Sequence, residues 1–150
     1  MVIRHYNTEA ATTDIVAPDM QAIDEREKAF ARAVNEVHSQ AMRTSPVQMA
    51  QSLRDALSTQ LLAYITGQSE RTVQRWARGD VGDIRQESKR RLVTAYEILQ
   101  IINRFEAPGV AQTWFIGSEP QLDFVMPAKA LREDQLEEAL AAARSFVAVG

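Results

Sequence analysis

Apolar residues recur at spacings of three and four positions along most of this chain, which is the period of an α-helix with one buried face. The pattern is strongest over residues 86–105, where the apolar stripe is wide enough for burial on two sides. Shorter stretches of the same kind predict further helices over residues 19–43, 46–57, 110–116 and 127–131, and a last helix that Asp134 caps. No stretch requires a strand, so we expect an all-α protein.

Residues 61–79 carry the local signals of two short helices joined by a tight turn. Gly67 can adopt the positive φ that such a turn often requires, and Ser69 has the side chain of a helix N-cap. Gly79 stands where a glycine commonly ends a helix. With the preceding helix over residues 46–57, this order predicts a helix-turn-helix that resembles the Xre-type repressor motif.

The second helix of this motif has two chemically different faces. Val73 and Trp76 are three positions apart, so we expect them to face inward, with Trp76 as a core anchor rather than a base-stacking platform. The first residues of a recognition helix reach base edges, whereas neighbouring hydroxyl and basic groups contact phosphates. The residues predicted to bind DNA are Ser69, Glu70, Arg71, Thr72, Gln74, Arg75, Arg78 and Arg85. The alternative for each arginine is a solvated face or an exposed ion pair.

The formal net charge of the 150 residues is −3, so any nucleic-acid contact must come from a local basic patch. Residues 68–91 supply such a patch with seven basic and four acidic side chains. The basic ones are Arg71, Arg75, Arg78, Arg85, Lys89, Arg90 and Arg91. The last three form a run that is a phosphate clamp, a solvated face, or a site where Arg91 pairs with Glu87.

The composition argues against several other classes of protein. The chain has no cysteine, and its two histidines lie too far apart in sequence to suggest a metal site, so we expect neither metal nor cofactor. No Ser/His/Asp set or glycine-rich phosphate loop is present, so we do not expect an enzyme. No apolar run approaches the length of a membrane span, and no signal sequence is evident. We therefore expect a cytoplasmic protein that does not bind membranes.

Two apolar features follow the long helix. The cluster Trp114-Phe115-Ile116 is either part of the core or an aromatic anchor for a protein partner. The chain end, residues 145–150, is mainly apolar, so it either packs on the body of the protein or inserts into a partner.

From residue 61 onward the chain resembles the Xre/MbcA/ParS-type antitoxins. The resemblance includes Ser69-x-x-Thr72-Val73-x-x-Trp76-x-x-Gly79 and then Glu87-Ser88-x-Arg90-Arg91-Leu92. Its most specific part is Trp114-Phe115-x-x-x-x-Pro120-x-Leu122, followed by Pro127-Ala128-x-x-Leu131-Arg132. Many members carry a glycine pair just after this leucine, where the present chain has Asp123-Phe124.

This resemblance implies an antitoxin that neutralises a cognate toxin, most often a RES-domain enzyme that consumes NAD, and that represses its own operon. It also implies that the C-terminal end blocks the toxin's active-site cleft. The residues expected to bind the toxin are Trp114, Phe115, Pro120, Leu122, Phe146, Val147, Val149 and Gly150. The alternatives are a stand-alone or phage-type transcriptional regulator, and an interaction module that no longer reads DNA.

The predicted organisation has four parts. Residues 1–18 form a flexible tail, and residues 19–44 form a helix that either packs on its own domain or forms a dimer. Residues 45–106 form the DNA-binding domain with its long linking helix, and residues 107–150 form the toxin-binding domain. The expected assemblies are a homodimer or a hetero-oligomer with the toxin.

Overall fold

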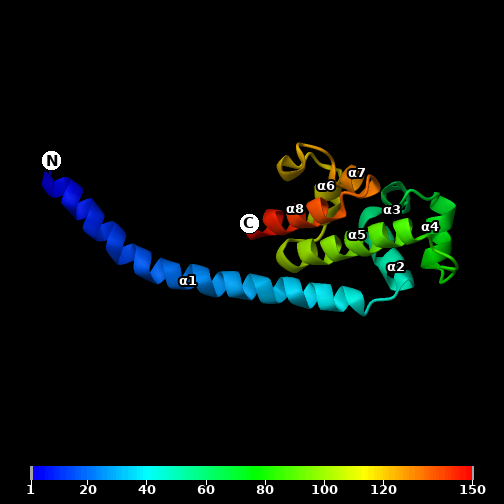
Figure 1. Ribbon diagram of the computed structural model, residues 1–150, viewed down its shortest axis with the longest axis horizontal. Coiled ribbons are helices and arrows are strands. Elements are labelled where there is room, and N and C mark those ends of the chain that lie inside the picture. Colours follow the sequence, from blue (N-terminus) through cyan, green and yellow to red (C-terminus); the bar gives the residue numbers. More distant parts are fainter. Residues whose placement is uncertain (1, 150) are drawn as a thin grey trace. The chain divides into compact units, whose positions relative to one another are not determined.

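The computed structural model describes the backbone of residues 2–149 and the side chains of residues 20–148. Over this range the protein is all-helical, as predicted, with eight α-helices, one 3-10 helix and no strand. The helices are α1 (Val2–Met42), α2 (Pro46–Leu57), α3 (Thr59–Thr66), α4 (Glu70–Ala77), α5 (Gln86–Phe105), α6 (Val110–Ile116), η1 (Pro120–Leu122), α7 (Pro127–Arg132) and α8 (Leu136–Val149) (Figure 1). No helix in this range is long and apolar enough to cross a membrane.

The chain divides into two compact units, Met1–Asn35 and Glu36–Gly150. The first unit contains most of α1, which begins at Val2, so the predicted helix start at Asp19 is wrong. The local signals at Asp19 therefore do not set the start of this helix. The flexibility predicted for residues 1–18 and the dimer contact predicted for residues 19–44 stay predictions.

The second unit is built around α5. Both sides of this helix are covered, because it packs against α2 and α3 as well as against α8 (Figure 1). The buried apolar residues of α5 are Leu92, Ala95, Tyr96, Ile98, Leu99, Ile101 and Ile102. The wide apolar stripe of the sequence thus has the predicted two-sided burial. The predicted domain boundary at residue 107 lies inside one compact unit, because α5 shares its core with the helices that follow it.

The last two turns of α1 belong to this second unit. Arg104 of α5 donates a hydrogen bond to Glu36 at 2.8 Å, and Val37 and Ala41 are buried. Glu97, a buried acid in the middle of α5, lies 3.1 Å from His38 Nδ1 and 3.8 Å from Arg144 Nη2 of α8. The predicted boundary at residue 45 therefore also falls within the unit.

The region after α6 differs from the sequence prediction at Asp134. This residue adopts a left-handed conformation, with φ of 64°, and α8 begins only at Leu136. Its carboxylate binds Arg91 instead of capping the helix. The inward face of α8 consists mainly of small residues, namely Ala139, Ala142, Ala143 and Val147, which allow close packing on α5.

Candidate functional site

The turn between α3 and α4 has the geometry that its sequence predicts. Gly67 is left-handed, with φ of 76°, and its N–H donates to the carbonyls of Ala63 and Tyr64. Ser69 caps α4 by accepting a hydrogen bond from the Thr72 amide at 3.1 Å. The Ser69 hydroxyl also donates to the Thr72 hydroxyl at 3.0 Å. Both polar side chains therefore have a structural role at this helix start, besides the phosphate contact predicted for them.

The buried inner face of α4 sets the orientation of the helix and so determines which side chains face outward. Val73 is fully buried and Trp76 is only 2 % exposed, so Trp76 is a core anchor, as predicted. Packing of α4 against α2 and α3 immobilises this inner face. The predicted DNA-binding residues Glu70, Arg71, Gln74, Arg75, Arg78 and Arg85 are all exposed, and Thr72 is half-buried. The structure thus leaves the side chains of the predicted set accessible on α4 and on the loop that follows it.

Two arginines of this surface border a small polar cavity of about 170 Å³. Arg75 and Arg85 line it together with Thr72 and Asp83. Arg75 Nε also lies 3.4 Å from Asp80 Oδ2, and both side chains are well exposed. Such an exposed pair is weak, so Arg75 can leave it for another anion at little cost.

Arg91 forms its hydrogen bonds with Asp134 and Thr66. It was predicted to contact a phosphate or to pair with Glu87. Its Nε and Nη2 donate to the two carboxylate oxygens of Asp134, both at 2.9 Å, and its Nη1 donates to the Thr66 carbonyl at 3.1 Å. The hydrogen bonds between Arg91 and Asp134 raise the pKa of Arg91 and lower the pKa of Asp134. Arg91 therefore ties the end of α3 to the turn before α8, whereas Lys89 and Arg90 stay exposed.

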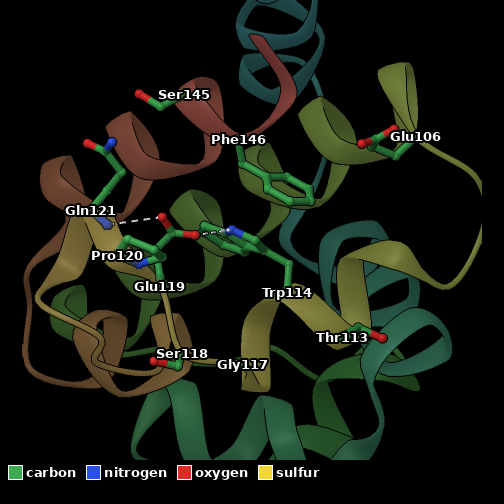
Figure 2. A pocket seen from close by; sticks show the side chains of 10 residues that line it. All are labelled: Glu106, Thr113, Trp114, Gly117, Ser118, Glu119, Pro120, Gln121, Ser145 and Phe146. Carbon is green, nitrogen blue, oxygen red and sulfur yellow. Dashed lines mark hydrogen bonds between the residues drawn. The ribbon is translucent and has the colours of Figure 1, made fainter. Parts of the chain in front are cut away.

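A pocket of about 580 Å³ opens between α6, η1 and α8 (Figure 2). Its aromatic wall consists of Trp114 and Phe146, whose ring centroids are 6.2 Å apart. Trp114 also meets Phe115 edge to face, with centroids 5.4 Å apart. Its indole N–H donates to Glu119 Oε2 at 2.9 Å, which fixes the orientation of the ring.

Glu119, which the sequence analysis missed, organises the loop beside this pocket. Its second carboxylate oxygen accepts from the Gln121 amide at 3.1 Å, as Figure 2 shows. Its carbonyl accepts from the amides of Leu122 and Phe124, both at 2.9 Å, and its own amide donates to the Val125 carbonyl. Glu119, which is 8 % exposed, thus forms hydrogen bonds with Gln121, Leu122, Phe124 and Val125 of this loop.

The two positions after Leu122 adopt a backbone conformation that glycine favours. Asp123 and Phe124 both adopt the left-handed conformation, with φ of 54° and 66°. Glycine adopts this conformation without strain, whereas an aromatic residue does so only where neighbouring contacts enforce it. Phe124 is also 70 % exposed.

The predicted toxin-binding residues separate into two groups. Phe115, Leu122 and Val147 are buried, so a direct contact with a partner is not supported for them, and their role is to shape the surface. The core interpretation also holds for Trp114, although its ring lines the pocket. Pro120 is exposed and Phe146 half-buried, and both line the same pocket. The side chain of Val149 and all of Gly150 lie outside the described residues.

Sequence patterns could not have identified Glu119, because nothing in its local sequence distinguishes it from an exposed acid.

Comparison of the chain with protein-family models, with curated proteins and with solved structures finds no match. The resemblance to the antitoxins therefore rests on the motifs quoted for it.

Proposed function

We propose that this protein is a cytoplasmic antitoxin that binds and neutralises a toxin, and that represses its own operon through α4. The toxin of this proposal is a RES-domain enzyme that consumes NAD, and the antitoxin itself catalyses no reaction. The observation that carries the proposal is the Trp114–Glu119 pair. It fixes an open aromatic pocket and a closed loop within the most specific motif of the family resemblance.

The surface of α4 supports the DNA-binding part of the proposal. Arg71, Gln74 and Arg75 project from a helix that is anchored by Val73 and Trp76. Arginine pairs with guanine and glutamine with adenine through two hydrogen bonds each. Exposed side chains of these types on a rigid helix have the chemistry for base reading.

Toxin binding is tested by co-expression with the product of the neighbouring gene, followed by co-purification and mass measurement. Phe146→Ala removes a half-buried ring from the pocket wall and should weaken the complex at least about tenfold, as expected for an aromatic anchor. Glu137→Gln is the control, because it alters an exposed residue on the same helix. If Phe146→Ala keeps full affinity, this pocket is not the binding surface.

DNA binding is tested by fluorescence anisotropy with the promoter of the protein's own gene. The double variant Arg71→Ala/Arg75→Ala should bind at least about tenfold more weakly, because each base-reading pair contributes about 1–3 kcal/mol. The control, Arg54→Ala/Arg104→Ala, removes the same charge from exposed pairs with Asp55 and Glu36. Equal losses in both variants would show a general charge effect and would refute recognition by α4.

Absence of a complex together with intact DNA binding would favour the stand-alone regulator. A complex without DNA binding would favour the interaction module. The two experiments thus separate the three hypotheses.

A further inference from the structure

We propose that the pocket between α6, η1 and α8 is a receptor for an arginine side chain of the partner protein. The identity of the partner rests on the proposed antitoxin function, whereas the chemistry of the pocket stands on its own residues. Three properties carry the proposal: the aromatic wall, the charge of the lining, and the buried state of Glu119.

The wall of the pocket suits a flat group. The rings of Trp114 and Phe146 are inclined by 38° to each other, and both border the open space in Figure 2. Pro120 and Gly117 extend this apolar lining. A planar cation that stacks on tryptophan gains both apolar contact and attraction to the ring quadrupole.

The charged side chains that the structure describes in the lining are both acidic. Glu106, at the C-terminal end of α5, and Glu119 line the pocket, and none of the described lining residues is basic. A positively charged group is therefore attracted into the pocket, and a phosphate or carboxylate is repelled. This feature distinguishes the pocket from a site for an anionic ligand such as a nucleotide.

Glu119 is a buried acid without a positive partner. It is 8 % exposed, and among the described residues its carboxylate oxygens accept hydrogen bonds from the neutral N–H groups of Trp114 and Gln121 alone. No ion pair joins it to a basic side chain within the described residues. A carboxylate oxygen can accept more than one hydrogen bond, so Glu119 keeps capacity for a cationic donor. An incoming cation compensates a charge that is costly to bury alone.

Arginine fits these properties better than lysine or an apolar side chain. Its guanidinium is planar, weakly hydrated and able to stack on a ring while it donates to a carboxylate. A lysine ammonium loses more hydration on entry, and an apolar side chain leaves both acids without a counter-charge. The same chain already uses this chemistry elsewhere, because the guanidinium of Arg132 lies 4.7 Å from the centre of the Tyr64 ring.

The test uses two small probes and the full chain. Nα-acetyl-L-arginine methylamide carries the guanidinium, and Nα-acetyl-L-citrulline methylamide is its neutral analogue of nearly the same shape. Binding is followed by NMR through the indole N–H signals, with the buried Trp76 as an internal reference. We expect saturable shifts of the Trp114 signal with the arginine probe at millimolar concentration, and at least about tenfold weaker binding of the citrulline probe.

Two variants assign the binding to the pocket. Glu106→Gln removes one lining charge with almost no change of shape and should weaken the arginine probe several-fold. Glu133→Gln, an exposed acid outside the pocket, should leave it unchanged. Equal binding of both probes, or a silent Trp114 signal, overturns the proposal. Because no toxin is present, either result leaves the antitoxin hypothesis to its own co-purification test.

Discussion

The indole N–H of Trp114 donates to the carboxylate of Glu119 at 2.9 Å, and both side chains are buried. This pair joins α6 to the loop that ends in Val125, because the backbone of Glu119 also closes that loop. The aromatic residue that looks like an anchor in the sequence is therefore one half of a polar contact within the protein. The consequences for stability can be measured directly.

Glu119→Gln should lower the free energy of unfolding by about 1–3 kcal/mol, because an amide can present an acceptor to only one of the two N–H donors. Urea denaturation followed by tryptophan fluorescence measures this change. Glu133→Gln is the matched control, since its exposed pair with Lys129 at 3.8 Å should contribute less than about 0.5 kcal/mol. A loss no larger than that of the control would contradict the role given to Glu119.

Gly67→Ala should destabilise the protein by roughly 1–2 kcal/mol, because alanine is strained at a positive φ. A Cβ at this position would also lie 2.9 Å from Arg91 Nη1 and would displace its hydrogen bond to Thr66. Gly79→Ala is the control, because Gly79 also has a positive φ but no atom lies within 4 Å of the added Cβ. Thermal unfolding should therefore show a larger loss for Gly67→Ala, and equal losses would mean that the Arg91 contact is unimportant.

Asp134→Asn should make stability less dependent on acid pH. Hydrogen bonding to Arg91 lowers the pKa of Asp134, so the ionised carboxylate stabilises the folded state above its ordinary pKa of 3.8. That contribution is lost as the pH falls through the lowered pKa. The variant should be less stable than the original protein near pH 7, and the two should converge only as the pH falls below 3.8 and through the lowered pKa of Asp134.

Asparagine suits this test because it tolerates the left-handed conformation of residue 134. In an Arg91→Met background the same substitution should have little effect, since the partner is missing. Denaturation across the pH range checks both statements. A constant difference between the two proteins at all pH values would show that the Arg91–Asp134 pair does not cause it.

Phe124→Gly should raise the free energy of unfolding, by up to about 1 kcal/mol. The substitution relieves a left-handed aromatic residue, and the exposed ring loses little burial. Gln121→Gly in the same loop is the control and should destabilise, because its φ is already ordinary and glycine only adds freedom to the unfolded chain. Destabilisation by both variants would show that residue 124 is not strained.

Local chemistry made the turn between α3 and α4 predictable. Gly67 and Ser69 act through neighbours within four residues, so their sequence context is sufficient. Asp134 resembled a cap for the same local reason, but its partner Arg91 lies 43 positions away. Only the packing of α5 against α7 and α8 brings the two together, and no periodic pattern encodes such a contact.

The candidate site shows the same limit. The inward face of α4 followed from spacing alone, and so did the outward position of its arginines. The pocket could not be predicted, because its lining comes from α5, α6, η1 and α8. Phe115 was predicted to bind a partner but is fully buried. Its apolar character fits a core residue and an exposed anchor equally well, so the sequence could not separate the two.

The way Glu119 closes its loop sets how that loop can move. The amides of Leu122 and Phe124 both donate to the Glu119 carbonyl, whereas the amide of Gln121 donates to its carboxylate. The amide hydrogens of Leu122 and Phe124 should therefore exchange with deuterium through a shared opening and with similar protection factors. A loop that contacts within the protein already hold in one conformation would lose little conformational entropy in any further contact.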